Sequence, residues 1–272
     1  MIGLVIDRAR ERAYAVDLAR AFAGALIFGA PLLMTMEMWR FGFLMSPARQ
    51  LAFLMAALPL LYGLSVYAGF SRNRGALPDL LDALAALAVG FLTAGAVLWL
   101  FGVLKPDEGL AAVAGQTLLL APPCAIGALV SRRQLDQDRP ADSDPPHYLG
   151  ELFLMAAGAL FLALNIAPTE EVVLIAALMD PARTLLLALV SLGLLHALVY
   201  AVGFAGEEAS ESGIEAFAHY TLPGYALCLI TGLFVLWLFG RTDGLAPGEA
   251  ASLAVVLGFP ASLGAAVARL LV

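Results

Sequence analysis

The sequence predicts an all-α membrane protein with eight transmembrane helices, arranged as two four-helix repeats of the same orientation. Composition is the first reason, because 61% of the residues are hydrophobic and only 14% are charged. Soluble domains average about 45–50% apolar and about 25% charged residues. The second reason is a set of apolar runs that each reach the roughly 20 residues needed to cross hydrocarbon. The third is that a long part of the first half returns in the second half.

The apolar runs define the spans, and polar or turn-forming residues separate them. The predicted spans are residues 20–44, 51–70, 79–103, 111–131, 150–178, 184–204, 214–239 and 249–271. Residues 1–19 precede the first span and are rich in both charges. They have no small-residue cleavage site after a short apolar region, so we expect an interfacial segment and no cleaved signal peptide.

Residues 23–70 align without a gap with residues 157–204, which predicts an internal repeat. The alignment places Glu37 on Glu171, and it repeats the sequence Pro-Ala-Arg that ends at Arg49 and at Arg183. Richness in Leu and Ala would not produce these polar matches.

The repeat continues beyond this alignment. Residues 97–102 return unchanged as residues 235–240, and Pro123 with Gly127 returns as Pro260 with Gly264. The repeated unit is therefore four spans long. Four spans bring the chain back to its starting side, so both halves should enter the membrane in the same direction.

This pattern predicts four regions: the segment 1–19, a first repeat 20–131, a cytoplasmic linker 132–149 and a second repeat 150–272. With both termini in the cytoplasm, ten Lys and Arg residues lie inside and five outside. Because positive charge gathers on the cytoplasmic side, this orientation is favoured.

The repeated glutamates are the main candidates for function. A carboxylate inside an apolar span is costly and usually has a functional role. We expect Glu37 and Glu171 to face each other across the pseudo-twofold axis and to line a path for cations or protons. Carboxylate oxygens suit hard cations, and two close carboxylates would divide their proton affinities.

Neighbouring polar residues would support this pair. Thr35 and Thr169 repeat one another and offer hydroxyl oxygens, and Asn165 and Glu170 flank the second glutamate. The segment from Asn165 resembles a helix start, with Asn as a cap followed by Pro and acids. We therefore expect the span 150–178 to break near residues 165–168, as spans of transporters often do, and Pro31 to kink the first span at the equivalent level.

Two structural interpretations compete with a pathway. Either glutamate could lie at the membrane interface and face lipid headgroups. Alternatively, Glu37 could form a local ion pair with Arg40 on the same helix. The second explanation accounts for only one half, because Leu174 takes the place of Arg40 in the repeat.

Further polar residues are weaker candidates. Tyr62 aligns with His196, so a polar group recurs at one depth. Asp79 and Asp82 begin the third span, and Glu215 and His219 lie near the matching place. Helix capping explains the acids equally well, since negative charge stabilises a helix N-terminus. A single buried histidine is often only a hydrogen-bonded structural residue.

Other classes of function lack support in the sequence. Cys124 and Cys228 lie inside apolar runs and are expected to be buried, without a disulfide or a metal. We find no motif for phosphate binding or hydrolysis, so no cofactor and no enzyme activity are expected. Ser191, His196 and Cys228 are the only scattered candidates for intramembrane catalysis. Nothing resembles a nucleic-acid-binding surface.

The first span carries a resemblance to a known family. The run Phe-Ala-Gly-Ala-Leu at residues 22–26, followed by Met-Thr-Met-Glu-Met-Trp at residues 34–39, resembles a family of bacterial integral membrane proteins of unknown function. The similarity extends over most of the chain. It implies a location in the bacterial inner membrane and assigns no role to any residue.

Together these patterns predict a cation channel, or a proton-coupled cation transporter, in the lipid bilayer. Its partners would be small inorganic cations or protons, and a homodimer would bring four equivalent glutamates together. The alternative is a non-transporting scaffold or sensor subunit, in which the glutamates are buried hydrogen-bond partners that hold the halves together.

Overall fold

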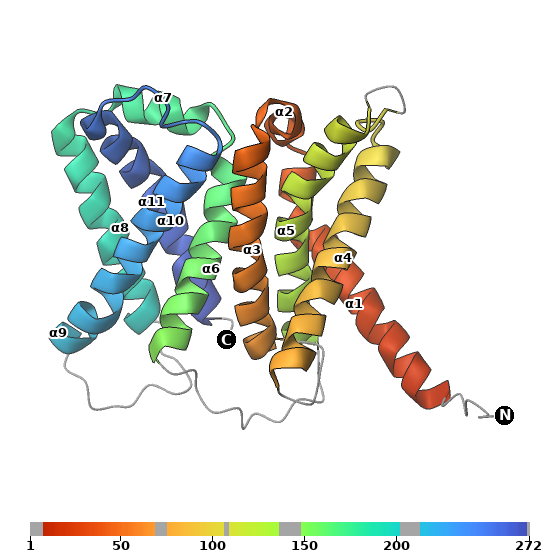
Figure 1. Ribbon diagram of the computed structural model, residues 1–272. Helices are drawn as coiled ribbons and strands as arrows, with labels where there is room; N and C mark the ends of the chain where they lie inside the picture. Colours follow the sequence, from red (N-terminus) through yellow and green to blue (C-terminus); the bar gives the residue numbers. More distant parts are fainter. Residues whose placement is uncertain (1–7, 69–74, 106–108, 136–147, 202–212, 271–272) are drawn as a thin grey trace. The chain divides into compact units, whose positions relative to one another are not determined.

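The computed structural model describes residues 8–68, 75–105, 109–135, 148–201 and 213–270 (Figure 1). Within these ranges every regular element is a helix, which confirms the predicted fold class. Eight helices are long and apolar enough to cross a membrane, as the sequence predicted. Most of the predicted linker 132–149, the ends of the aligned segments at Phe70 and Phe204, and the acidic stretch before residue 213 lie outside the described residues.

The helices follow one another in the order α1 (Arg8–Leu33), α2 (Met36–Leu44), α3 (Pro47–Ala68), α4 (Ala76–Leu100), α5 (Leu110–Leu135), α6 (Tyr148–Ile166), α7 (Glu171–Leu178), α8 (Pro181–Ala201), α9 (Gly213–Ala216), the π-helix η1 (Phe217–Thr221), α10 (Leu222–Leu238) and α11 (Pro247–Leu270). The short helix α2 follows the first long helix of the first half. The short helix α7 follows the first long helix of the second half.

Two predicted spans are shorter than the sequence suggested. The predicted span 20–44 is divided between α1 and α2, and the predicted span 150–178 between α6 and α7. Helices α2 and α7 have 9 and 8 residues. At a rise of about 1.5 Å per residue they are too short to cross about 30 Å of hydrocarbon. Glu37 and Glu171 therefore lie beyond the ends of the spans, which close at Leu33 and Ile166.

The expected break after α6 is present, but its details differ from the prediction. Asn165 does not begin α7; it lies in the last turn of α6, and its Nδ2 donates to the carbonyl of Phe161 at 2.7 Å. The helix ends because Ala167 precedes Pro168, and the residue before a proline is disfavoured in the helical conformation. Glu170 occupies the N-cap position of α7, without a side-chain capping bond.

The break in the first half lies after the proline and not at it. Helix α1 passes through Pro31 and ends at Leu33. The Thr35 backbone N–H donates to the carbonyl of Leu32 at 3.1 Å, and the Thr35 hydroxyl donates to the carbonyl of Pro31. These bonds satisfy carbonyl groups that the end of a helix leaves without partners.

The chain forms two compact units. Unit 1 comprises Met1–Thr35 and Leu54–Arg139, and unit 2 comprises Met36–Phe53 and Pro140–Val272. Helices α1, α4 and α5 pack together in unit 1, and α11 packs against α6, α8 and α10 in unit 2. Helix α2 and the first turns of α3 thus belong to the unit that holds the second half.

Each unit contains very close approaches between helix backbones, and one of them has a counterpart in the other unit. In unit 1, a Cβ atom on Gly24 of α1 would lie 2.5 Å from the carbonyl oxygen of Gly127 of α5. In unit 2, a Cβ atom on Gly158 of α6 would lie 2.2 Å from the carbonyl oxygen of Gly264 of α11. Only glycine permits such contact, which is a common way for membrane helices to pack.

Candidate functional site

Arg241, in the turn after α10, is the centre of a polar cluster in unit 2. Its Nη1 donates to Glu170 Oε1 at 3.1 Å, and its Nη2 donates to the carbonyl of Pro168. Its guanidinium lies over the ring of Phe41 on α2, 5.4 Å from the ring centroid. Only 14% of this side chain is exposed. Arg241 therefore satisfies a carbonyl at the break between α6 and α7 and also holds α2 by a cation–π contact.

The local sequence explains why Arg241 reaches this position. Helix α10 ends at Leu238 and is followed by Gly240, whose φ of +71° is a conformation that favours glycine. The Gly240 N–H donates to the carbonyl of Trp237 at 3.0 Å, and the Arg241 N–H donates to that of Leu236 at 2.8 Å. These two bonds form a Schellman motif, which turns the chain sharply after the helix.

A second basic residue fixes α2 and the start of α3 to the same turn. Arg49 Nη2 donates to Asp243 Oδ1 at 2.6 Å, and its guanidinium lies 5.5 Å from the centroid of Trp237. The hydrogen bond from Arg49, together with the attraction of its charge, lowers the pKa of Asp243 below its usual value. The rings of Phe41 and Phe239 meet edge to face at 4.9 Å.

The two repeated glutamates lie next to this cluster in the chain. Glu37 is half-buried in the first turn of α2, one turn before Phe41, so the two side chains share a helix face. Glu171 is exposed in the first turn of α7 and follows Glu170 directly. Arg241 therefore contacts both elements that carry the repeated acids.

Neither repeated glutamate has an ion pair or a hydrogen bond to another residue in the described part of the chain. The expected alternative of a local pair between Glu37 and Arg40 is thus not formed, and Arg40 is exposed. Four carboxylates, those of Glu37, Glu170, Glu171 and Asp243, accompany the three guanidinium groups of Arg40, Arg49 and Arg241. This end of unit 2 therefore carries an excess of negative charge, which favours cations.

The predicted supporting residues bond to their own helices. Thr169 Oγ1 donates to the carbonyl of Ile166 at 2.7 Å, as the Thr35 hydroxyl and the Asn165 amide do to earlier carbonyls. These hydrogens are therefore used by the backbone, although the oxygen atoms can still accept bonds. In the ranges that the structure describes, no group of three His, Cys, Asp or Glu side chains is placed to hold a metal ion.

The weaker candidates in the second half gather around η1 in unit 2. His196 Nδ1 lies 2.8 Å from Thr221 Oγ1, and its ring meets Phe217 edge to face at 5.3 Å. His219 Nδ1 lies 3.0 Å from the carbonyl oxygen of Glu215. A π-helix inserted in an α-helix often marks a functional position.

The weaker candidates in the first half belong to unit 1. Ser65 Oγ on α3 lies 2.8 Å from the carbonyl oxygen of Tyr62 and 2.6 Å from that of Asp79. Asp79 and Asp82 are half-buried in the first two turns of α4, and Asp82 interacts with other residues. The Asp79 carbonyl therefore joins the first turn of α4 to Ser65 of α3 within unit 1.

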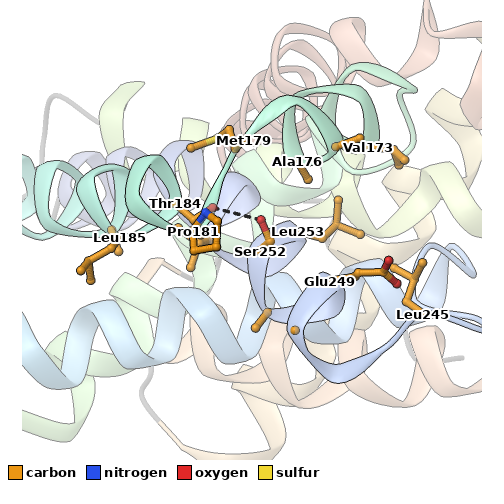
Figure 2. A pocket seen from close by; sticks show the side chains of 15 residues that line it. Val173, Ala176, Met179, Pro181, Thr184, Leu185, Leu245, Glu249, Ser252 and Leu253 are labelled. Carbon is orange, nitrogen blue, oxygen red and sulfur yellow. Dashed lines mark hydrogen bonds between the residues drawn. The ribbon is translucent and has the colours of Figure 1, made fainter.

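The structure adds a feature that the sequence did not indicate, a cavity of about 820 Å³ between α7, α8 and α11. Figure 2 shows Val173, Ala176 and Met179 on one side and Glu249, Ser252 and Leu253 on another. A hydrogen bond of 3.2 Å joins Thr184 Oγ1 and Ser252 Oγ on its wall. Its walls are otherwise mostly apolar.

Sequence reasoning also assigned no site role to Arg49, Arg241 and Asp243. A signal was present within the repeat. After the shared residues 97–102 and 235–240, the first half continues with Val103 and Lys105, where the second half has Arg241 and Asp243. A change of chemistry at one turn of an otherwise repeated segment indicates a specific contact.

Comparison with known proteins places the chain in a family without assigning it an activity. No curated protein and no solved structure matches it. The model of one protein family matches residues 17–272, which is nearly the whole chain. The chain therefore belongs to the family described as "Putative integral membrane protein (DUF2391)".

Proposed function

We propose that this integral membrane protein is a channel or transporter for a small cation, or for a cation coupled to protons, and that it acts without catalysing a reaction. The observation that supports this proposal is the arrangement around Arg241. Glu170 neutralises the guanidinium, and Glu37 and Glu171 remain without ion pairs among the described residues. Both carboxylates lie in the first turn of a short helix that follows the end of a span, at the same place in each half.

In this proposal Glu37 and Glu171 attract the cation, and Thr35 and Thr169 offer hydroxyl oxygens as further ligands. Glu170 and Asn165 shape the break before α7. In a proton-coupled transporter the same pair of carboxylates would carry the proton.

The proposal includes two repeats that enter the bacterial inner membrane in the same direction, with both termini in the cytoplasm. The matched contact of Gly24 with Gly127 and of Gly158 with Gly264 supports the repeat. The turns after α4 and α10 support it as well, since Gly102 and Gly240 have φ values of +70° and +71°.

Ion flux into liposomes that contain the purified protein would test the proposal. Glu37→Gln and Glu171→Gln should each lower cation flux roughly fivefold or more, since a unit charge 4 Å away is worth about 1 kcal/mol even in bulk water. Asp180→Asn is a matched control. It removes one carboxylate charge from the next turn, where Asp180 caps α8 by accepting a bond from the Arg183 N–H at 2.8 Å, and it should leave flux unchanged.

Proton flux under the same conditions would separate a pure cation path from a proton-coupled one. Unchanged flux and unchanged ion selectivity in the double variant Glu37→Gln/Glu171→Gln would contradict the proposal.

The contacts of Arg241 and Arg49 favour a second candidate function, a non-transporting scaffold or sensor subunit. Arg241 holds α2, and Arg49 holds the start of α3, against the turn after α10, so they build a stable surface without needing a pathway. In that case the wild-type protein should show no cation flux, and the glutamate variants should leave the unfolding temperature unchanged, because their carboxylates have no bonded partner among the described residues. A transport protein should show cation flux that the glutamate variants reduce.

A further inference from the structure

The cavity between α7, α8 and α11 begins where two spans begin. The spans on α8 and α11 start at Pro181 and Pro247. Residues lining the cavity continue to Ala188 on α8 and to Val255 on α11. Seven residues of helix correspond to about 10 Å, so the cavity extends through much of one leaflet of a hydrocarbon core about 30 Å thick.

The polar groups on the walls are already satisfied by the protein. Thr184 Oγ1 donates to the carbonyl of Asp180 at 3.1 Å, and Ser252 Oγ lies 3.2 Å from Thr184 Oγ1. Glu249 Oε2 accepts a bond from the Ala246 N–H at 3.0 Å. An occupant therefore has little need to supply hydrogen bonds inside the cavity.

The size of the cavity also decides what can fill it. Its volume of about 820 Å³ is far larger than the voids of a packed protein interior. It lies instead in the range of roughly 300–1,000 Å³ that is usual for ligand pockets. In a bilayer the molecule of matching shape and chemistry is an acyl chain.

A cation lies in the turn of α8 at which the cavity begins, although it is not one of the lining residues. Arg183 is in the first turn of α8, between the lining residues Pro181 and Thr184. Its side chain is 69% exposed, and its ion pair with Asp180 is long, at 3.7 Å. Exposed pairs of this kind contribute little energy, so the guanidinium can bind a phosphate group.

We propose that this cavity is a binding site for a membrane phospholipid, with one acyl chain between α7, α8 and α11 and the phosphate at Arg183. The site is separate from the Arg241 cluster, and it does not depend on the proposed transport of cations.

Native mass spectrometry of the detergent-solubilised protein would count the lipid that stays bound after incubation with a phosphatidylglycerol. Ala188→Phe and Ala176→Phe fill the cavity from two different walls. Each should reduce bound lipid at least about tenfold, because losing the burial of two methylene groups already costs about that factor. Leu189→Phe is the matched control, because Leu189 lies on α8, is exposed and does not line the cavity.

Arg183→Gln separates a phospholipid from a free fatty acid. This variant should retain less phosphatidylglycerol than the wild type, while both retain the same amount of palmitic acid. A thermal unfolding curve shows whether each variant is folded. If either Ala188→Phe or Ala176→Phe does not fold, the other variant still tests the proposal.

Three results would overturn the proposal. In the first, a folded variant with a filled cavity binds as much lipid as the Leu189→Phe control. In the second, phosphatidylglycerol is retained equally with and without Arg183. In the third, the wild-type protein retains no lipid.

Discussion

The turns after α4 and after α10 have nearly the same backbone and very different contacts. Both follow the sequence Val-Leu-Trp-Leu-Phe-Gly, and both close with the two bonds of a Schellman motif. The residue after the glycine is Val103 in one turn and Arg241 in the other. Arg241 binds Glu170, Pro168 and Phe41 within unit 2. The comparison teaches that a few residues determine the backbone of a turn, while the residue after the glycine determines which contacts the turn makes.

The paired glycines are the strongest test of the similarity between the two units. Gly158→Val should lower the free energy of unfolding by about 3 kcal/mol or more, because the new side chain would overlap the backbone of α11. Gly24→Val should have an effect of the same order in unit 1, where the new atoms would meet Gly127 and Ser131. Chemical unfolding in detergent micelles measures both values.

Gly193→Ala on α8 is the control for the glycine variants. A Cβ atom at Gly193 would meet no other atom within 4 Å, so alanine should stabilise the helix by about 0.5–1 kcal/mol. If Gly158→Val is as stable as Gly193→Ala, the helices α6 and α11 do not approach as described.

Arg241→Val tests the difference between the two turns by giving the second turn the residue of the first. It removes a charged hydrogen bond, a bond to a backbone carbonyl and a cation–π contact. The loss in the free energy of unfolding should be about 2 kcal/mol. Val103→Ala in the first turn is the control and should cost under about 1 kcal/mol. Equal losses from the two variants would mean that Arg241 contributes no specific contact.

The pair of Asp243 with Arg49 gives a smaller effect that depends on pH. The pKa of Asp243 is lower in the folded protein, mainly through the hydrogen bond from Arg49. Its contribution to stability is therefore complete above the ordinary aspartate pKa of about 3.9 and disappears as the pH falls through the lower folded value. The unfolding temperature of the wild type should approach that of Asp243→Asn at acidic pH. A constant difference between the two at every pH would contradict this.

Length and hydropathy were sufficient to predict the eight helices, because crossing a bilayer requires long apolar segments. The break before α7 was also predictable, since Pro168 interrupts the helical pattern. In the first half the sequence predicted only a kink at Pro31, because a proline is a visible signal. The helix instead ends at Leu33, where the sequence carries no such signal. The depth of Glu37 was misjudged for the same reason.

The contacts between distant segments could not be predicted in the same way. Arg241 lies far from Glu170 and Phe41 in the sequence, and no periodic pattern connects them. The cavity was also invisible, because residues such as Ala176 and Ala188 look like ordinary members of apolar helices. Its presence depends on the space between three helices, which only the packing of unit 2 determines.

The course of α3 has a consequence for how the protein can be divided. This single helix starts in the unit of the second half and continues into that of the first, because the boundary falls between Phe53 and Leu54. Cutting the chain between Arg139 and Pro140 would therefore not release two self-sufficient pieces. The carboxy-terminal piece would lose the segment that covers Arg241, and the amino-terminal piece would carry that segment without its binding surface. The second unit can therefore fold completely only when both halves of the polypeptide are present.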